Sequence, residues 1–160
     1  MEFHAVALSI PEGCNLILGQ THFIKSVQDL YEVMVGGVPN AKFGVAFSEA
    51  SGPCLIRAEG NDPALKAAAI KNIQDVACGH AFCIVMSGCF PINVLNAVKA
   101  CPEVANVFCA TANPAEVLVA QTGQGRGVMG VVDGFPPKGV ETDDDVKERR
   151  EFLKMIGYKL

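Results

Sequence analysis

In the run Gly123-Gln-Gly-Arg-Gly-Val-Met-Gly-Val-Val-Asp-Gly-Phe-Pro-Pro-Lys-Gly139, glycines surround one arginine and one aspartate just after an apolar segment. Three of these glycines spell GxGxxG, the fingerprint of a dinucleotide-binding βαβ unit, in which a helix directly follows the glycines. Here residues 128–132 continue as a β-like run that Pro136-Pro137 ends. The run therefore predicts a glycine-rich β-hairpin and no βαβ dinucleotide site.

The same glycines suit a ligand loop. Glycine lets the backbone approach a ligand closely, so Gly125 and Gly127 on either side of Arg126 predict a site for an anion or a nucleotide. The structural alternative is a tight turn in which the glycines serve geometry alone.

Outward from this hairpin, strand pairs alternate with helices. Apolar periodicity predicts strands at 3–10, 14–18, 42–49, 54–58, 80–86, 104–111 and 116–121, and helices at 21–34, 61–79 and 91–99. A last helix begins at the aspartate run 143–145, with Phe152, Leu153 and Ile156 as its inner face. This order predicts an α/β protein (α+β mixed), with a mixed sheet flanked by helices in one domain over residues 1–160. The recurring ββα order hints at a duplicated unit.

Composition narrows the class of protein. The chain has 160 residues, of which 50% are hydrophobic and 19% charged, with a net charge of −4. A nucleic-acid-binding protein needs a basic face, which this balance does not favour. No apolar run reaches membrane-spanning length and the N-terminus lacks the features of a signal peptide, so neither a membrane nor a secretory route is expected. The positive mean hydropathy of +0.29 indicates apolar surface buried between subunits.

The seven cysteines have no regular spacing, which favours a reducing cytoplasm over a disulfide framework. Cys78, His80 and Cys83 lie close in sequence but lack the paired spacing of zinc ligands, so no metal site is expected.

Two histidines are candidates for chemistry. His22 lies where a helix is predicted to open, with Thr21 as its N-cap and Lys25 one turn on; free amides and the helix dipole there favour an anion. A phosphoryl group on His22 would be held by these groups, whereas the structural alternative is a packed capping-region histidine. His80 begins a buried strand, where a satisfied core imidazole is the simpler interpretation.

Polar side chains at three strand ends complete the candidate site. Glu49 follows one strand, Thr111 and Asn113 follow another, and Asp133 ends the glycine-rich strand. Ligands of open α/β sheets collect beyond strand ends, so these residues and Arg126 would suit a nucleotide if they converge. Arg126 would pair with phosphate, and Asp133 would accept the proton of an attacking hydroxyl. Local turn formation is the alternative for Glu49.

Six runs together resemble the adenosine-specific kinase family, once described as a domain of unknown function in archaea and some bacteria. They are 19–25, 42–52, 79–82, 90–99, 108–114 and 123–134, and they span nearly the whole chain. The resemblance implies a compact α/β subunit that forms a trimer, binds adenosine or AMP, and carries a phosphorylated histidine. The helix-terminus argument favours His22 as that histidine, with His80 as the alternative.

The chain has neither a GxxxxGK[ST] phosphate loop nor the motif set of protein kinases. A phosphohistidine mechanism is therefore the hypothesis: His22 carries the phosphoryl group, Arg126 and Lys25 stabilise it, and Asp133 activates the 5′-hydroxyl of adenosine. The only cofactor left open is Mg²⁺ arriving with a phosphoryl donor. Alternatives are a non-catalytic AMP or adenosine sensor, and an enzyme acting on another phosphorylated compound.

Overall fold

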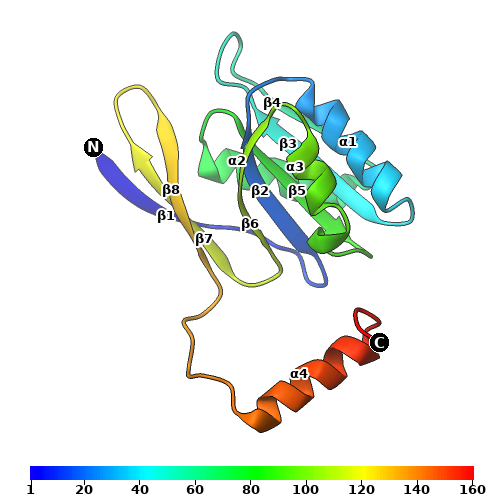
Figure 1. Ribbon diagram of the computed structural model, residues 1–160. Helices are drawn as coiled ribbons and strands as arrows, with labels where there is room; N and C mark the ends of the chain where they lie inside the picture. Colours follow the sequence, from blue (N-terminus) through cyan, green and yellow to red (C-terminus); the bar gives the residue numbers. More distant parts are fainter.

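The computed structural model describes residues 1–160 and contains two antiparallel sheets with four α-helices (Figure 1). The larger sheet has the strand order β4-β3-β5-β2-β6. Its strands are β2 (Asn15–Thr21), β3 (Lys42–Ser48), β4 (Ile56–Gly60), β5 (Ala81–Ser87) and β6 (Val104–Thr111). The smaller sheet has the order β1-β7-β8, from β1 (Glu2–Ala7), β7 (Ala115–Gln121) and β8 (Arg126–Asp133).

The glycine-rich hairpin is confirmed. β8 pairs antiparallel with β7, and no helix follows the GxGxxG glycines. The register shifts between Leu118 and Val119, which leaves Met129 of β8 without an opposite partner. Such a bulge bends a strand locally and increases its twist.

Two hydrophobic clusters lie on the two faces of the larger sheet. Alternate residues of β2, β3 and β5 point to opposite faces, as the period of two in a strand requires. One face packs against α1 (Ser26–Gly37) and α3 (Leu95–Ala100). A short 3₁₀ helix, η1 (Pro91–Asn93), precedes α3. The other face packs against α2 (Pro63–Val76) and the inner side of the smaller sheet. The body is therefore layered, with the larger sheet in the middle.

Most element boundaries shift by a few residues from the sequence-based prediction, and three differences matter for the site and the fold. α1 begins at Ser26, because Thr21 is still the buried last residue of β2 and its hydroxyl does not cap the helix. Cys54 is exposed in a turn with a φ of 52°, and is not part of a strand. β1 and β2 lie in different sheets, whereas β3 and β4 pair, so the ββα recurrence in the sequence does not become a repeated arrangement.

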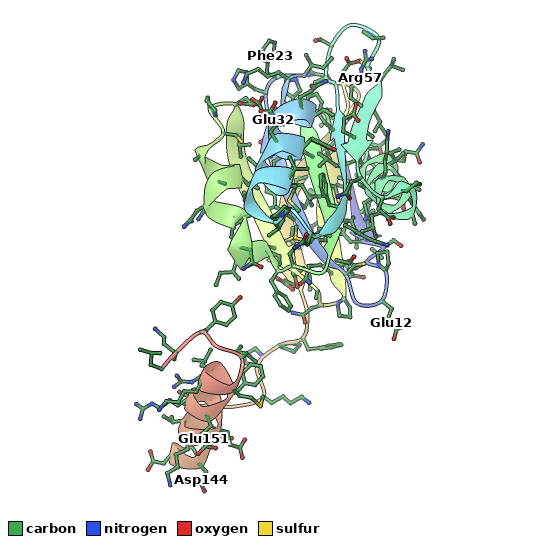
Figure 2. The ribbon with its side chains drawn as sticks, turned by 90° about the vertical axis from the view of Figure 1, so that its right-hand side faces the viewer. Glu12, Phe23, Glu32, Arg57, Asp144 and Glu151 are labelled. Atoms are coloured by element: carbon green, nitrogen blue, oxygen red, sulfur yellow. The ribbon has the colours of Figure 1, made fainter.

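The last helix, α4 (Asp143–Met155), stands apart from the body (Figures 1 and 2). It is well started, since the Thr142 hydroxyl accepts from the Asp145 amide and the Asp145 carboxylate accepts from the Thr142 amide. None of its residues is buried. The prediction that Phe152, Leu153 and Ile156 form an inner face against the chain's own core is therefore wrong. No helix of the protein is long and apolar enough to cross a bilayer.

Candidate functional site

The two candidate histidines lie together. His22, in the turn after β2, and His80, just before β5, line one cleft of about 290 Å³ with Phe47 and the β3–β4 loop. β2 and β5 are neighbours in the sheet, with Gln20 opposite Ala81. This register brings the two histidines to the same end of these two strands. His80 is half-buried and lines this cleft, so it is not fully enclosed in the core.

The backbone of His80 is held in an unusual conformation. Its φ is 62°, in the left-handed region that non-glycine residues seldom occupy. The His80 amide donates to the Ser48 carbonyl at 2.8 Å, and its own carbonyl accepts from the Thr21 amide at 2.9 Å. The ring stacks on Phe47, with centroids 5.8 Å apart. These contacts fix the imidazole at the cleft wall.

His22 is exposed, and its backbone is anchored from the other side. Its amide donates to the Glu103 carbonyl at 3.1 Å. The Thr21 hydroxyl donates to the same carbonyl at 3.0 Å and shares a 2.6 Å hydrogen bond with Ser26, so it is buried and engaged. Thr21 therefore positions His22 but does not offer its hydroxyl to a ligand. The amides of residues 23–25 donate to no backbone carbonyl, which leaves free donors next to His22.

Lys25 is paired with carboxylates. Its ammonium contacts Asp29 one turn along α1 and lies 3.5 Å from Oε2 of Glu103, a side chain only 2% exposed. The hydrogen bond from Lys25 lowers the pKa of Asp29, and that bond likewise raises the pKa of Lys25. Lys25 thus lies near His22 in sequence, but its charge is directed toward α1 and the start of β6.

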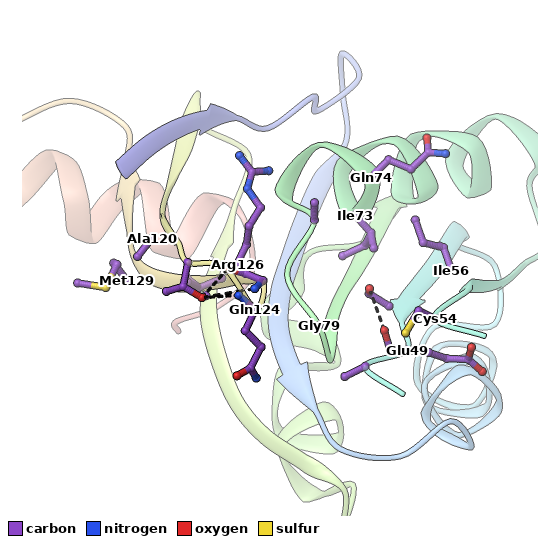
Figure 3. A pocket seen from close by; sticks show the side chains of 17 residues that line it. Glu49, Cys54, Ile56, Ile73, Gln74, Gly79, Ala120, Gln124, Arg126 and Met129 are labelled. Carbon is purple, nitrogen blue, oxygen red and sulfur yellow. Dashed lines mark hydrogen bonds between the residues drawn. The ribbon is translucent and has the colours of Figure 1, made fainter. Parts of the chain in front are cut away.

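A larger cleft of about 830 Å³ adjoins the histidine cleft, and Glu49 and Ala50 line both. In Figure 3, Gln124 and Arg126 of the β7–β8 hairpin form one side, and Glu49 and Cys54 of the β3–β4 loop lie on the other. Gly125 and Gly127 also line it, and a Cβ added at either would meet no atom within 4 Å. A volume of this size accommodates a nucleoside or nucleotide.

Glu49 organises the loop that separates the two clefts. Its Oε2 accepts from the Leu55 amide at 2.8 Å, and its Oε1 accepts from the Arg57 guanidinium at 2.8 and 2.9 Å. The Leu55 hydrogen bond, followed by Arg57, lowers the pKa of Glu49. The contacts of Glu49 are thus those of a turn-forming residue. Glu49 also lines both clefts, so it would lie beside a ligand bound in either of them.

Arg126 reaches across to the carboxyl end of α2. Its Nη1 donates to the carbonyls of Asp75 at 3.1 Å and Val76 at 3.3 Å, where a cation complements the helix dipole. Its Nε is buried without a partner. The guanidinium therefore fixes the hairpin against α2 and also lines the larger cleft.

Thr111, Asn113 and Asp133 form a separate group. Oδ1 of Asp133 accepts from the Thr111 hydroxyl at 2.7 Å and from the side-chain Nδ2 of Asn113 at 3.3 Å, beside a pocket of about 500 Å³. Across β2 and β6, Leu16 is opposite Thr111 while Thr21 is opposite Val104. The five residue steps from Leu16 to Thr21 along β2 put the two ends about 17 Å apart. Within one chain, this group does not converge with His22.

Two residues of the site were not singled out from the sequence. Arg57 holds Glu49, and Glu103 anchors His22 through its carbonyl and faces Lys25 with its side chain. A lone arginine in a strand and a lone glutamate after a proline carry no local signal, because their roles arise from contacts made far along the chain.

No group of three or more His, Cys, Asp and Glu side chains is arranged to hold a metal ion, and all seven cysteines are free thiols. Burial raises the pKa of Cys83, and raises that of Cys109 to about 11. These two thiols are therefore core residues and not nucleophiles.

Three comparisons bear on this chain. A family model described as adenosine specific kinase matches residues 6–159. No curated protein matches it. Among solved structures, the crystal structure of PH1918 protein from Pyrococcus horikoshii OT3 is similar, at 46% sequence identity and a TM-score of 0.95, over 99% of this chain and 98% of the other. Since the family model covers nearly the whole sequence, the chain belongs to the adenosine-specific kinase family.

Proposed function

We propose that this protein transfers a phosphoryl group from His22 to the 5′-hydroxyl of adenosine. The observation that carries the proposal is the meeting of His22 and His80 in one cleft, which shares Glu49 and Ala50 with a second cleft of nucleoside size. Family membership supplies the substrate class.

The chemistry needs a carrier and a base. In the proposed step, the phosphorus–nitrogen bond at His22 breaks and its electron pair returns to the imidazole. A new phosphorus–oxygen bond forms to the adenosine 5′-oxygen, and the hydroxyl proton passes to the imidazole of His80. Histidine suits both roles because its ordinary pKa is close to neutrality. The assignment reversed, with His80 as carrier, is the alternative.

The surroundings supply charge and shape. The free backbone amides of residues 23–25 would face the phosphoryl oxygens. The Lys25 ammonium would have to leave Asp29 to bind the same oxygens. Gly125 and Gly127 let a nucleoside lie against bare backbone, and Arg126 adds a positive charge to that wall. Any Mg²⁺ would arrive with the phosphoryl donor.

Asp133 has no part in this step within a single chain, because it is hydrogen-bonded to Thr111 at the end of the larger sheet away from His22. A ligand-binding role for Thr111, Asn113 and Asp133 in their own pocket stays a prediction.

The test is phosphate incorporation by full-length protein incubated with labelled phosphoryl donors. His22→Ala should abolish acid-labile label and leave adenosine affinity, measured by calorimetry, within about threefold. His4→Gln is the matched control, since His4 lies in β1 away from the clefts. Label that persists in His22→Ala and disappears in His80→Asn would move the carrier to His80.

A non-catalytic AMP or adenosine sensor is the second candidate, because the larger cleft needs no nucleophile to bind a nucleotide. It predicts tight binding with no labelled histidine in the wild-type protein. Titration with adenosine, AMP and inorganic phosphate separates the kinase and the sensor from an enzyme that acts on other phosphorylated compounds. Such an enzyme would bind inorganic phosphate as well as it binds AMP, because it does not recognise adenine.

A further inference from the structure

The pocket of about 500 Å³ beside Asp133 lies at the end of the larger sheet away from the histidine cleft. The start of β2 and the turn between β6 and β7 meet there, at the lower end of the body in Figure 1. Phe90 and residues of η1 and α3 also line it. We call it the Asp133 pocket. Small-molecule sites in proteins commonly have volumes of about 300–1,000 Å³, so this one has the size of a ligand site.

One carboxylate oxygen in the Asp133 pocket is held by the chain and the other is free. Oδ1 of Asp133 accepts from the Thr111 hydroxyl and from Nδ2 of Asn113. The Thr111 hydroxyl is itself oriented, because it accepts from the backbone amide of Asn113 at 2.9 Å. No group of the chain donates to Oδ2 of Asp133. The turn therefore fixes the carboxylate and leaves one oxygen to accept a donor from a ligand.

Phe90 adds an aromatic ring to the same pocket. Its side chain is 59% exposed, although an aromatic side chain is normally stabilised by burial. The backbone beneath it is fixed, since the Phe90 amide donates to Oδ1 of Asn93 at 2.9 Å and Pro91 begins η1 directly after it. An exposed ring in a fixed place allows a flat heterocycle to stack on it.

The charge of the Asp133 pocket distinguishes it from the larger cleft. Asp133 is the only charged residue among the eleven that line the pocket, and none of them is Lys, Arg or His. The larger cleft, in contrast, has Arg126 on its wall. A phosphate beside a carboxylate with no cation to neutralise it would be repelled. The pocket therefore suits a ligand that carries no phosphate.

We infer that the Asp133 pocket is a second ligand site of this chain, which binds an unphosphorylated nucleoside with an amino group on its base. The ring stacks on Phe90, and the amino group donates to Oδ2 of Asp133. Carboxylates accept from the amino groups of bases, and amide side chains such as that of Asn96, which also lines the pocket, pair with base edges. Binding here needs no transfer at His22, which lies at the other end of the sheet.

The first test uses the absence of tryptophan from the sequence, because Phe90→Trp then places a single indole in the proposed stacking position. Adenosine should quench its fluorescence saturably, since a stacked base contacts the indole. AMP should need at least a tenfold higher concentration. Inosine should need a similar excess, because a carbonyl replaces the amino group and cannot donate to Asp133. No quenching by adenosine, or a midpoint for AMP or inosine equal to that for adenosine, would overturn the inference.

The second test removes the free acceptor and keeps the turn. In Asp133→Asn, Oδ1 still accepts from Thr111 and Asn113, while an NH₂ donor replaces Oδ2. In the Phe90→Trp background this substitution should raise the adenosine concentration at half-quenching at least tenfold. Glu116→Gln is the matched control: it removes an exposed carboxylate from β7 outside the pocket and should leave the midpoint unchanged. An unchanged midpoint in Asp133→Asn would contradict a site at this carboxylate.

A third variant separates the Asp133 pocket from the reaction proposed at the histidine cleft. In the Phe90→Trp background, His22→Ala should leave quenching by adenosine unchanged, whether or not His22 carries a phosphoryl group. A failure of phosphate incorporation would thus remove the proposed reaction and leave the second site standing. Loss of quenching in His22→Ala would mean that the signal comes from the histidine cleft, and the second site would be rejected.

Discussion

At the scale of single residues, His80 combines a functional position with backbone strain. A side chain at a φ of 62° costs about 1 kcal/mol relative to glycine, and this strain is retained at a residue that lines the same cleft as His22. Its two backbone hydrogen bonds, to Ser48 and Thr21, require this conformation whatever the side chain.

A pair of substitutions separates the strain from the chemistry. His80→Gly should be more stable than His80→Ala by about 1 kcal/mol in urea unfolding, because only glycine adopts this φ freely. Both should lose phosphoryl transfer to adenosine, since both lack the imidazole. Equal stabilities would show that the conformation is not strained, and activity in both would remove His80 from the mechanism.

The Glu49 carboxylate gives the β3–β4 loop a pH dependence. Its pKa is lowered in the folded protein from 4.5, mainly by the Leu55 amide and then by Arg57. A lowered pKa means that its contribution to stability is present above pH 4.5 and is lost as the pH falls through the folded value. The Leu55 amide resonance should therefore titrate with a midpoint below 4.5 and stop titrating in Glu49→Gln. A midpoint at or above 4.5 would contradict the hydrogen bond.

The candidate site was predictable only as separate parts. Helix-start and glycine-loop patterns pointed to His22 and to Gly125, Arg126 and Gly127, and the structure places both sets at adjoining clefts. Their relation to His80 depends on β2 pairing with β5, a contact between segments more than sixty residues apart. A different pairing, of β2 with β6, sets Thr111 opposite Leu16 and so puts its hydrogen-bond partner Asp133 beside the other end of the larger sheet.

At the scale of elements, α2 lies unusually close to β3. A Cβ at Gly44 would overlap the backbone of Leu65 and Lys66, so the helix reaches this distance only because Gly44 has no side chain. The start of the helix is fixed by Asp62, whose carboxylate accepts from the Leu65 amide at 3.0 Å, with Pro63 in the first turn.

Two glycine substitutions should have opposite effects. Gly44→Ala must push α2 off the sheet and should destabilise the protein by about 3 kcal/mol or more, as overpacking of a core does. Gly36→Ala, in the last turn of α1, meets nothing within 4 Å and should be neutral or stabilising by up to about 1 kcal/mol. Denaturant midpoints measure both, and a tolerated Gly44→Ala would mean that α2 can move.

Most elements were predictable because their signals are local. Asn61-Asp62-Pro63 marked the start of α2, and Pro136-Pro137 excluded a helix after the GxGxxG run. The predicted start of α1 at Thr21 was wrong, because a threonine before an apolar stripe has the pattern of an N-cap. Thr21 is instead held as the last residue of β2 by the carbonyls of His80 and Glu103, which no local pattern reveals.

At the scale of the whole molecule, sequence patterning correctly marked α4 as amphipathic but assigned its apolar side to the wrong surface. Periodicity shows that a face will be buried and says nothing about which chain buries it. The positive mean hydropathy of +0.29 predicted buried surface between subunits; in the single chain, large exposed apolar side chains include Phe152 and Met155 of α4 and Phe3 and Leu118 of the three-stranded sheet.

If a second copy of the chain stabilises α4, the protection of its amides must depend on protein concentration. Amide hydrogen exchange within residues 146–155 should slow by at least tenfold between dilute and concentrated protein, because the helix alone is marginal and gains its stability on assembly. Amides of β5, which pair on both sides inside the body, should exchange at the same rate throughout. Protection of α4 that is high and independent of concentration would mean that α4 is stabilised by its own chain.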